Sequence, residues 1–286
     1  MSIRVEDYHK VYGETVAVAG ISFAVAPGEI LGLVGPNGAG KTTTLRALAG
    51  ILTPTRGRLF LAGHDVVLDP LAAKRELAYV PDEPQLFERL TVWEHFRFIA
   101  SVYHVKKWKP RAEDLLKRLE LTEKRDALAM ELSRGMRQKV AIGCGLLHTP
   151  RALLFDEPMT GLDPHGIRTM KDLIRDYAAT RHAPLTLPSP PTEGGEGRVR
   201  GDGAAVILSS HLLSLIEDLC TTVLIMHRGH VLRHGRLSEL RRELHDVNGK
   251  HETLEELFFR LTGMGPDEHI QAGADERIQA TAGGQP

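Results

Sequence analysis

The sequence is poor in the features that mark secreted, membrane-spanning or nucleic-acid-binding proteins. Its 286 residues include two cysteines, Cys144 and Cys220, in apolar surroundings without a pairing motif, so we expect buried free thiols in a reducing compartment. No run reaches the roughly 18 apolar residues of a membrane-spanning helix, and the N-terminus lacks the apolar segment of a secretory signal. The 36 Lys and Arg residues balance the 37 Asp and Glu residues, which argues against binding nucleic acid through a basic surface. These absences favour a soluble cytoplasmic protein.

Short apolar runs alternate with helical patterns at both ends of the chain. Strands are predicted over residues 16–25, 28–35, 77–80, 152–156 and 204–210, and helices over 41–52, 167–179 and 213–220. Hairpins are predicted to turn at residues 62–63 and 228–229. Between about residues 84 and 150 the apolar spacing is mainly helical. The pattern predicts an α/β core with an inserted α-helical subdomain.

Two features of the helical part carry further expectations. Trp93, Phe96 and Phe98 are expected in its core, although some of them could instead line a groove for a partner helix. The basic run Lys106 to Arg111 is expected to be a solvated linker between helices rather than a nucleic-acid patch.

Two segments lack any periodicity. Residues 182–204 hold four prolines and five glycines between a predicted helix and a predicted strand, where connections are usually about 2 to 6 residues long. Two interpretations stay open for this insertion: a tolerated surface loop, or an insertion that binds a partner or disrupts activity. Residues 264–286 are small and polar, and we expect a disordered tail there.

The most specific motif is a glycine-rich phosphate loop of the form G-x-x-x-x-G-K-[ST], which follows a predicted strand and opens a predicted helix. It consists of Gly35, Pro36, Asn37, Gly38, Ala39, Gly40, Lys41 and Thr42, and we count the adjacent Thr43 with it. The glycines allow backbone N–H groups to surround phosphate oxygens, and the helix N-terminus adds partial positive charge. Lys41 is expected to reach the terminal phosphates of ATP, and Thr42 to ligate Mg²⁺.

A pair of carboxylates ends the apolar run 152–155. Burying Asp156 and Glu157 there would be costly without a cation or hydrogen bonds. Together with the phosphate loop, Asp156 is predicted to hold Mg²⁺ and Glu157 to polarise the attacking water as a catalytic residue.

These residues, in this order, resemble the ATP-binding subunits of ABC transporters over nearly the whole chain to about Gly263. Leu132 to Gln138 resembles the family's signature sequence, Gly161 to Asp163 its D-loop, and Ser210-His211 its switch histidine. The resemblance implies a phosphate-loop NTPase core with a mixed sheet and an N-terminal antiparallel β subdomain. It also implies one ATPase domain over residues 1–263.

The resemblance assigns further roles to single residues. Tyr12 would stack on adenine, His211 would contact the γ-phosphate as a second catalytic residue, and Asp163 would belong to the nucleotide site. In this family two subunits pair head to tail, so Ser133 and Gly135 of one would cap the ATP held by the other.

The sequence departs from the family pattern at two motifs. Asp82 stands where the family has a glutamine that touches Mg²⁺, and we keep it as a candidate metal ligand. Arg134 and Met136 replace Gly and Gln of the signature. Three functions therefore stay open: a transport ATPase, a catalytically weakened partner in a heterodimer, and a non-transport ATPase of DNA repair or translation.

The family resemblance favours the transport ATPase. It implies partnership with separate transmembrane permease subunits and with a second ATP-binding subunit, on the inner face of the cell membrane. The phrase over residues 252–258 resembles the ending of exporter-type subunits, which favours export.

Overall fold

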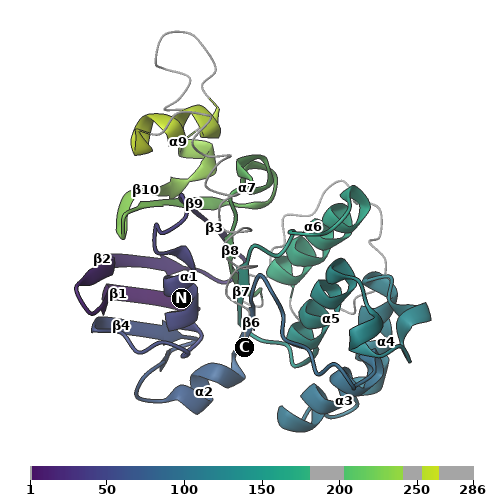
Figure 1. The fold of residues 1–286 in the computed structure, drawn as a ribbon. Helices are drawn as coiled ribbons and strands as arrows, with labels where there is room; N and C mark the ends of the chain where they lie inside the picture. Colours follow the sequence, from purple (N-terminus) through teal and green to yellow (C-terminus); the bar gives the residue numbers. More distant parts are fainter. Residues whose placement is uncertain (1, 181–202, 241–252, 264–286) are drawn as a thin grey trace, which may run out of the picture.

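A six-stranded sheet forms the centre of the computed structural model, which describes residues 2–180, 203–240 and 253–263 (Figure 1). Its strand order is β10-β9-β3-β8-β7-β6; the strands are β3 (Ile30–Val34), β6 (Leu77–Val80), β7 (Ala152–Asp156), β8 (Ala205–Ser209), β9 (Thr222–His227) and β10 (His230–Arg236). Only β10 is antiparallel to its neighbour. The buried runs of β3, β7 and β8 suit parallel strands covered on both faces.

A second, antiparallel sheet precedes and follows the phosphate loop in the chain. Its order is β2-β1-β4-β5, with strands β1 (Ile3–Tyr12), β2 (Thr15–Val25), β4 (Arg56–Leu61) and β5 (His64–Asp65). The expected turn at Ala62 and Gly63 is present, and both residues have positive φ, at 49° and 93°. The mixed sheet and this antiparallel sheet confirm the predicted fold class, whereas β1 was not among the predicted strands.

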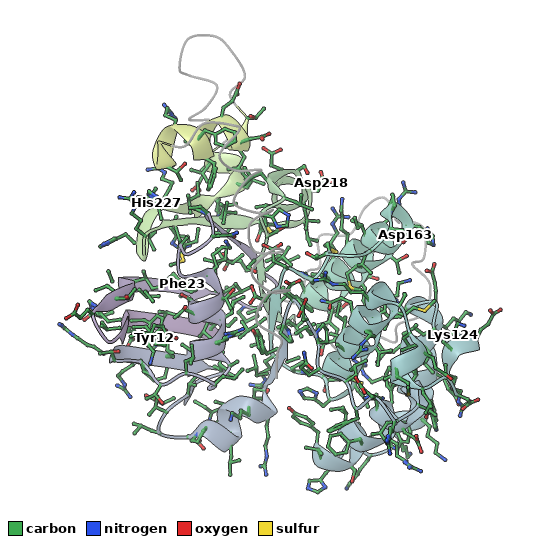
Figure 2. All side chains as sticks on the ribbon, in the orientation of Figure 1. Tyr12, Phe23, Lys124, Asp163, Asp218 and His227 are labelled. Atoms are coloured by element: carbon green, nitrogen blue, oxygen red, sulfur yellow. The ribbon has the colours of Figure 1, made fainter. Side chains whose placement is uncertain are left out.

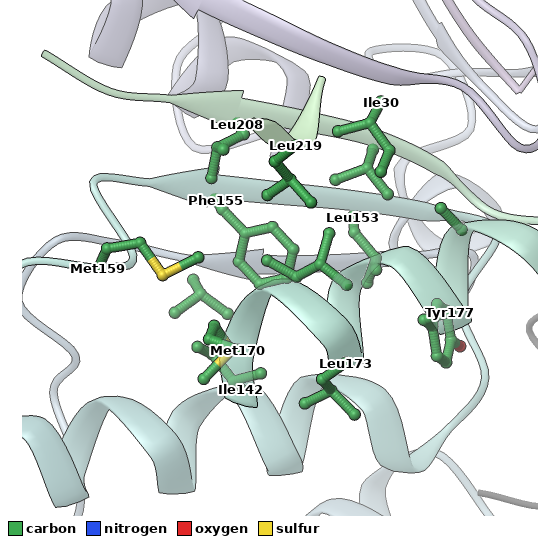
Figure 3. Packing of buried hydrophobic residues seen from close by; sticks show 14 of the residues in the cluster. Ile30, Ile142, Leu153, Phe155, Met159, Met170, Leu173, Tyr177, Leu208 and Leu219 are labelled. Carbon is green, nitrogen blue, oxygen red and sulfur yellow. The ribbon is translucent and has the colours of Figure 1, made fainter. Parts of the chain in front are cut away.

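The two faces of the six-stranded sheet carry different layers. Leu31, Leu33 and Leu154 point toward the antiparallel sheet and α1 (Lys41–Leu48). Residues one position away, such as Leu153 and Phe155, point toward the opposite layer. That layer holds α6 (Pro164–Ala179) and α7 (Leu213–Leu219), and Figure 3 shows Met170, Leu173 and Tyr177 beneath the strands. Because successive side chains of a strand point to opposite faces of the sheet, alternate residues belong to two separate hydrophobic cores.

The predicted helical subdomain is present as a lobe beside the sheet (Figure 1). It contains α3 (Val92–Val102), α4 (Trp108–Arg118), α5 (Arg134–Leu147) and the 3₁₀ turns η1 (Thr122–Lys124) and η2 (Ala129–Glu131). Thr91 and Glu94 form a capping box that begins α3. The buried Phe96 ring approaches Gly143 so closely that a Cβ there would lie 2.7 Å from Phe96 Cζ, which joins α3 to α5.

Two expectations about this lobe were wrong. Phe98 is 43 % exposed and packs on Phe87 rather than in the core, because it lies on the outer face of α3. The run from Lys106 is not a linker throughout, since α4 begins at Trp108. Trp108 packs against Trp93 with ring centroids 4.8 Å apart, and this contact holds the first turn of α4 in place.

Two further helices were not predicted. α2 (Pro70–Arg75) follows β5, and α9 (Leu254–Thr262) begins with a capping box between Thr253 and Glu256. The backbone N–H of Leu254 donates to Glu217 of α7 at 3.1 Å, which attaches α9 to the sheet layer.

The predicted insertion over 182–204 lies almost wholly outside the described residues, and the predicted tail over 264–286 lies wholly outside them. Gly203, near the end of this insertion, contacts the last turn of α6: a Cβ on Gly203 would lie 2.2 Å from the carbonyl oxygen of Ala178. Ala204 then accepts a hydrogen bond from Gly28 N–H at 3.0 Å.

Both cysteines are buried free thiols, as expected. Burial raises the pKa of Cys144 to about 12, so this thiol stays protonated and unreactive at neutral pH. Along the described ranges, no helix combines the length and hydropathy needed to cross a bilayer.

Candidate active site

The phosphate loop connects β3 to α1, and close packing requires its glycines. A Cβ on Gly35 would lie 2.4 Å from the carbonyl oxygen of Met226, and one on Gly40 would lie 2.7 Å from that of Ala17. Gly38 and Gly40 also adopt φ of 76° and 102°, where other residues are strained. The loop is therefore fixed against β2 and β9 by contacts that only glycine allows.

Lys41 and Thr42 begin α1 directly after this loop. The Lys41 side chain is only 8 % exposed, and its Nζ donates to the carbonyl oxygens of Gly35 at 2.6 Å and Pro36 at 3.2 Å. The Lys41 ammonium group thus folds back over the phosphate loop and binds its first two residues. Thr43 supplies a carbonyl oxygen to the Tyr8 hydroxyl at 3.4 Å, which ties the loop to the antiparallel sheet.

Asp156 lies at the carboxyl end of β7 and is 4 % exposed. Thr42 Oγ1 donates to its Oδ1 at 3.2 Å, and Ser209 Oγ donates to the same oxygen at 2.6 Å. Ser209 is the partner of Asp156 in the β7–β8 register. Sequence reasoning missed Ser209, although its position one residue before Ser210-His211 at the end of a buried run was a usable signal.

Glu157 and His211 meet at the same edge of the sheet. His211 Nδ1 lies 2.9 Å from Glu157 Oε2. This hydrogen bond, and then the Glu157 charge, raise the pKa of His211 above its ordinary value, against burial and the Lys41 charge. Glu157 has φ of 48°, an uncommon conformation for a non-glycine residue, and its N–H donates to the Ser209 carbonyl at 3.2 Å.

Asp82 follows β6 at the same edge but is paired differently. Its Oδ1 accepts a hydrogen bond from Arg134 Nη2 at 3.2 Å. Burial raises the pKa of the Asp82 carboxyl, and the negative charges of Glu157, Glu83 and Asp156 add to this, while Arg134 opposes it. The structure brings Asp82 near the other carboxylates, yet its hydrogen bond is to Arg134, whereas Thr42 donates to Asp156.

Four predicted site residues stand apart from this cluster. Ser133 caps α5 by accepting from Met136 N–H, and Asp163 caps α6 by accepting from Gly166 N–H at 2.8 Å. Gly135 packs on Gly161: a Cβ there would lie 2.9 Å from the Gly161 oxygen. Tyr12 is 46 % exposed on the antiparallel sheet, with Lys10 Nζ 4.9 Å from its ring centroid. Figure 2 shows Tyr12 and Asp163 on opposite sides of the molecule.

The arrangement fits a nucleoside triphosphate with a divalent cation. The glycine cradle cannot accept a Cβ, the buried Lys41 ammonium lies across it, and the α1 N-terminus opens from it. The hydroxyl of Thr42 and the carboxylate of Asp156 are oxygen ligands of the kind that Mg²⁺ takes. The structure thus brings Lys41, Thr42, Asp156 and Glu157 together at one edge of the sheet, while Ser133 and Gly135 lie on another lobe.

The chain matches the family model described as "ABC transporter" over residues 18–160. It is 31% identical to the ABC-type transporter ATP-binding protein EcsA of Bacillus subtilis over 91% of this chain and 96% of that protein. It is also 31% identical to the lipopolysaccharide export system ATP-binding protein LptB of Acidithiobacillus ferridurans, over 83% of this chain and 91% of that one.

A solved structure agrees with these sequence matches. A structure titled as the ATP-binding subunit of an ABC transporter superposes with a TM-score of 0.78 at 30% identity, covering 91% of this chain and 99% of the other. The matched relatives are transport proteins, so the DNA-repair and translation alternatives are not favoured. The chain belongs to the ABC transporter family, as an ATP-binding subunit.

Proposed function

We propose that this chain binds and hydrolyses ATP to drive the export of a substrate across a membrane. One observation carries the hydrolytic part: Thr42 at the start of α1 donates to Asp156 at the end of β7, and Glu157, the next residue, lies beside His211, which follows β8. Phosphate-binding, metal-binding and water-activating groups thus converge at the carboxyl ends of adjacent parallel strands.

The side chains divide the chemistry between them. Lys41 and the loop N–H groups would hold the β- and γ-phosphates, and Thr42 and Asp156 would hold Mg²⁺, which supplies neutralising charge when bound. Glu157 would accept a hydrogen bond from water, whose oxygen attacks the γ-phosphorus in line with the departing oxygen of ADP. The bond to that oxygen breaks, ADP keeps the electron pair, and the water proton passes through Glu157 to solvent.

His211 fits the role of an orienting partner for Glu157. Its Nδ1 lies 2.9 Å from the carboxylate, and its imidazole is 53 % exposed at the open side of the site. His211 would therefore fix Glu157 and contact the γ-phosphate from the solvent side. Because Arg134 holds the Asp82 carboxylate by a hydrogen bond, we do not propose Asp82 as a metal ligand.

The separate position of the signature supports a dimer. Ser133 is the N-cap of α5 and is exposed, so its hydroxyl can face a second subunit. We infer that two such subunits enclose ATP between the phosphate loop of one and Ser133 and Gly135 of the other. Asp163 would lie at this interface and Tyr12 would stack on the adenine.

Transport requires membrane-spanning partners, since the described ranges contain no helix able to cross a bilayer. We propose separate permease subunits and a location on the cytoplasmic face of the cell membrane. The proposed direction of transport, export, rests on similarity to proteins named for export and for drug resistance.

ATP hydrolysis by the purified chain tests the proposal, with Glu157→Gln as the decisive variant. We expect a magnesium-dependent rate that falls at least about 100-fold in Glu157→Gln, while ATP converts this variant to a stable dimer on gel filtration. Glu113→Gln, an exposed carboxylate on α4, is the matched control and should retain the full rate. Equal rates for both variants, or no ATP-dependent dimer, would contradict the proposal.

A further inference from the structure

Arg134, the first residue of α5, connects three segments that are distant in the sequence. Its Nη2 lies 3.2 Å from Asp82 Oδ1 and 3.8 Å from Glu83 Oε1, in the loop that follows β6. Its methylene stem packs on the loop that follows β7, since a Cβ on Gly161 would lie 3.2 Å from Arg134 Cδ. Gly161 also has φ of 81°, so both this backbone conformation and the close approach of Arg134 favour glycine at this position. The guanidinium is thus supported from one side and paired on the other.

The charges around Asp82 show what the guanidinium does there. Glu83 from its own loop, and Asp156 and Glu157 from the end of β7, all repel the Asp82 carboxylate. Arg134 opposes this repulsion and donates directly to the Asp82 carboxylate, and a protonated His211 also attracts it. Without Arg134, Asp82 would lose the cation with which it makes a hydrogen bond.

The pair spans the boundary between the helical lobe and the sheet. Asp82 leaves β6 of the six-stranded sheet, whereas Arg134 opens α5 of the helical lobe, 52 positions later. The side chains are 51% and 44% exposed for Arg134 and Asp82. Half-exposed ion pairs of this kind contribute little to stability, so breaking this contact would cost little if the helical lobe shifted against the sheet.

We propose that Arg134 is a positioning residue that acts through Asp82. Its guanidinium holds the Asp82 carboxylate toward α5 and neutralises its charge beside the phosphate-binding centre. The position of α5 thereby controls how much negative charge faces the bound nucleotide. This inference rests on the proposed nucleotide chemistry of the same site and adds a residue and a partner to it.

A double-mutant cycle tests whether Arg134 acts through Asp82. Arg134→Gln removes the charge and retains part of the stem over Gly161. The freed carboxylate should repel the triphosphate and raise KM for Mg²⁺·ATP about fivefold, with kcat changed less than about twofold. In the Asp82→Asn background the same substitution should change KM less than about 1.5-fold, because no carboxylate is left to repel the nucleotide. Arg134→Lys retains the charge and should restore most of the wild-type KM.

Arg97→Ala is the matched control, because Arg97 also makes an exposed ion pair in the helical lobe, with Glu94 at 3.5 Å within α3. It should leave KM unchanged. Equal effects of Arg134→Gln in both backgrounds would overturn the proposal, since Arg134 would then act independently of Asp82. An unchanged KM in Arg134→Gln would overturn it as well.

Equilibrium binding of Mg²⁺·ATP to the same variants, measured by calorimetry, separates this inference from the proposed hydrolysis. If the wild-type chain binds but does not hydrolyse ATP, hydrolysis is refuted, and the affinity cycle alone decides the role of Arg134. If the wild-type chain binds no Mg²⁺·ATP, both proposals are overturned.

Discussion

The phosphate loop and the first turn of α5 both contain short glycine motifs, but the fold holds them in different ways. Gly35 and Gly40 are enclosed by backbone oxygens of β9 and β2 at distances that no Cβ could occupy. The start of α5 is held by side chains instead: the Ser133 cap, the Arg134 ion pairs and the contact of Gly135 with Gly161. The loop is thus built to be rigid before the nucleotide arrives, whereas the start of α5 can change partners.

Gly35→Ala, in the rigid phosphate loop, should cause the largest loss of stability. The new Cβ would lie 2.4 Å from the Met226 oxygen, and neither backbone segment can move away cheaply. We expect the free energy of unfolding to fall by about 3 kcal/mol, measured by urea denaturation. Gly38→Ala is the control, because a Cβ there meets nothing within 4 Å and only φ of 76° is strained; about 1 kcal/mol is expected. Equal losses would show that the enclosure does not matter.

Ser209→Ala should destabilise the carboxyl ends of β7 and β8, where Ser209 contacts Asp156. The Ser209 hydroxyl is buried and donates to the Asp156 carboxylate at 2.6 Å. Its removal leaves a buried charged oxygen with one donor fewer, so unfolding free energy should fall by about 2–3 kcal/mol. Ser210→Ala provides the comparison, since Ser210 Oγ accepts from the uncharged Leu212 N–H at 3.0 Å. A smaller loss for Ser209→Ala than for Ser210→Ala would refute the importance of the Asp156 contact.

His148, at the far end of α5, should make stability depend on pH. Its Nε2 lies 3.0 Å from the Leu77 oxygen of β6, its ring stacks on Tyr103, and burial lowers its pKa from 6.5 to about 4. The folded chain therefore binds this proton less readily than the unfolded chain. Stability is retained above about pH 6.5 and declines as the pH falls toward 4, by roughly 2 kcal/mol after allowance for partial exposure.

Urea denaturation between pH 4 and 7 measures this effect. In His148→Gln the part of the slope that belongs to this residue should disappear. A slope identical to that of the wild-type chain would show that the pKa of His148 is the same in the folded and unfolded chains. The expected result would mean that a buried, neutral His148 attaches the C-terminal end of α5 to β6.

Ser133→Ala, at the start of α5, should cause the smallest loss of stability. The exposed Ser133 hydroxyl accepts one hydrogen bond, from Met136 N–H at 3.3 Å. We expect a loss of about 0.5–1 kcal/mol in unfolding free energy. Thr91→Ala in the reciprocal capping box of α3 should cost more, because Thr91 exchanges hydrogen bonds with Glu94 in both directions. A larger loss for Ser133→Ala would mean that the start of α5 is more rigid than its contacts indicate.

The predictable parts of the molecule are those that depend on neighbours in the sequence. The phosphate loop is one uninterrupted motif, and the runs of β3, β7 and β8 are buried on both faces, so composition alone predicts strands there. β1 was missed because its burial is interrupted: Asp7 has φ of 47°, and the β1–β2 register shifts three times. The sequence of such a strand does not alternate simply between apolar and polar residues.

The unpredicted parts depend on strand order and helix placement. Ser209 reaches Asp156 across 53 positions because β8 lies beside β7, and Arg134 reaches Asp82 across 52 positions because α5 begins beside the end of β6. Neither pairing has a local pattern. Phe98 was misplaced for the same reason, since the apolar spacing of α3 does not say which of its aromatic residues faces α5.

The contact between Ala178 and Gly203 has a practical consequence. The chain leaves α6 and returns toward β8 at a single point, and the position of β8 is then set by its pairing with β3 and β7 and by the Gly28–Ala204 hydrogen bond. The distance between these two described ends is thus fixed by contacts of the fold itself. An affinity tag inserted between positions 180 and 203 would join the fold at this one point, at the opposite end of β8 from Ser209 and His211.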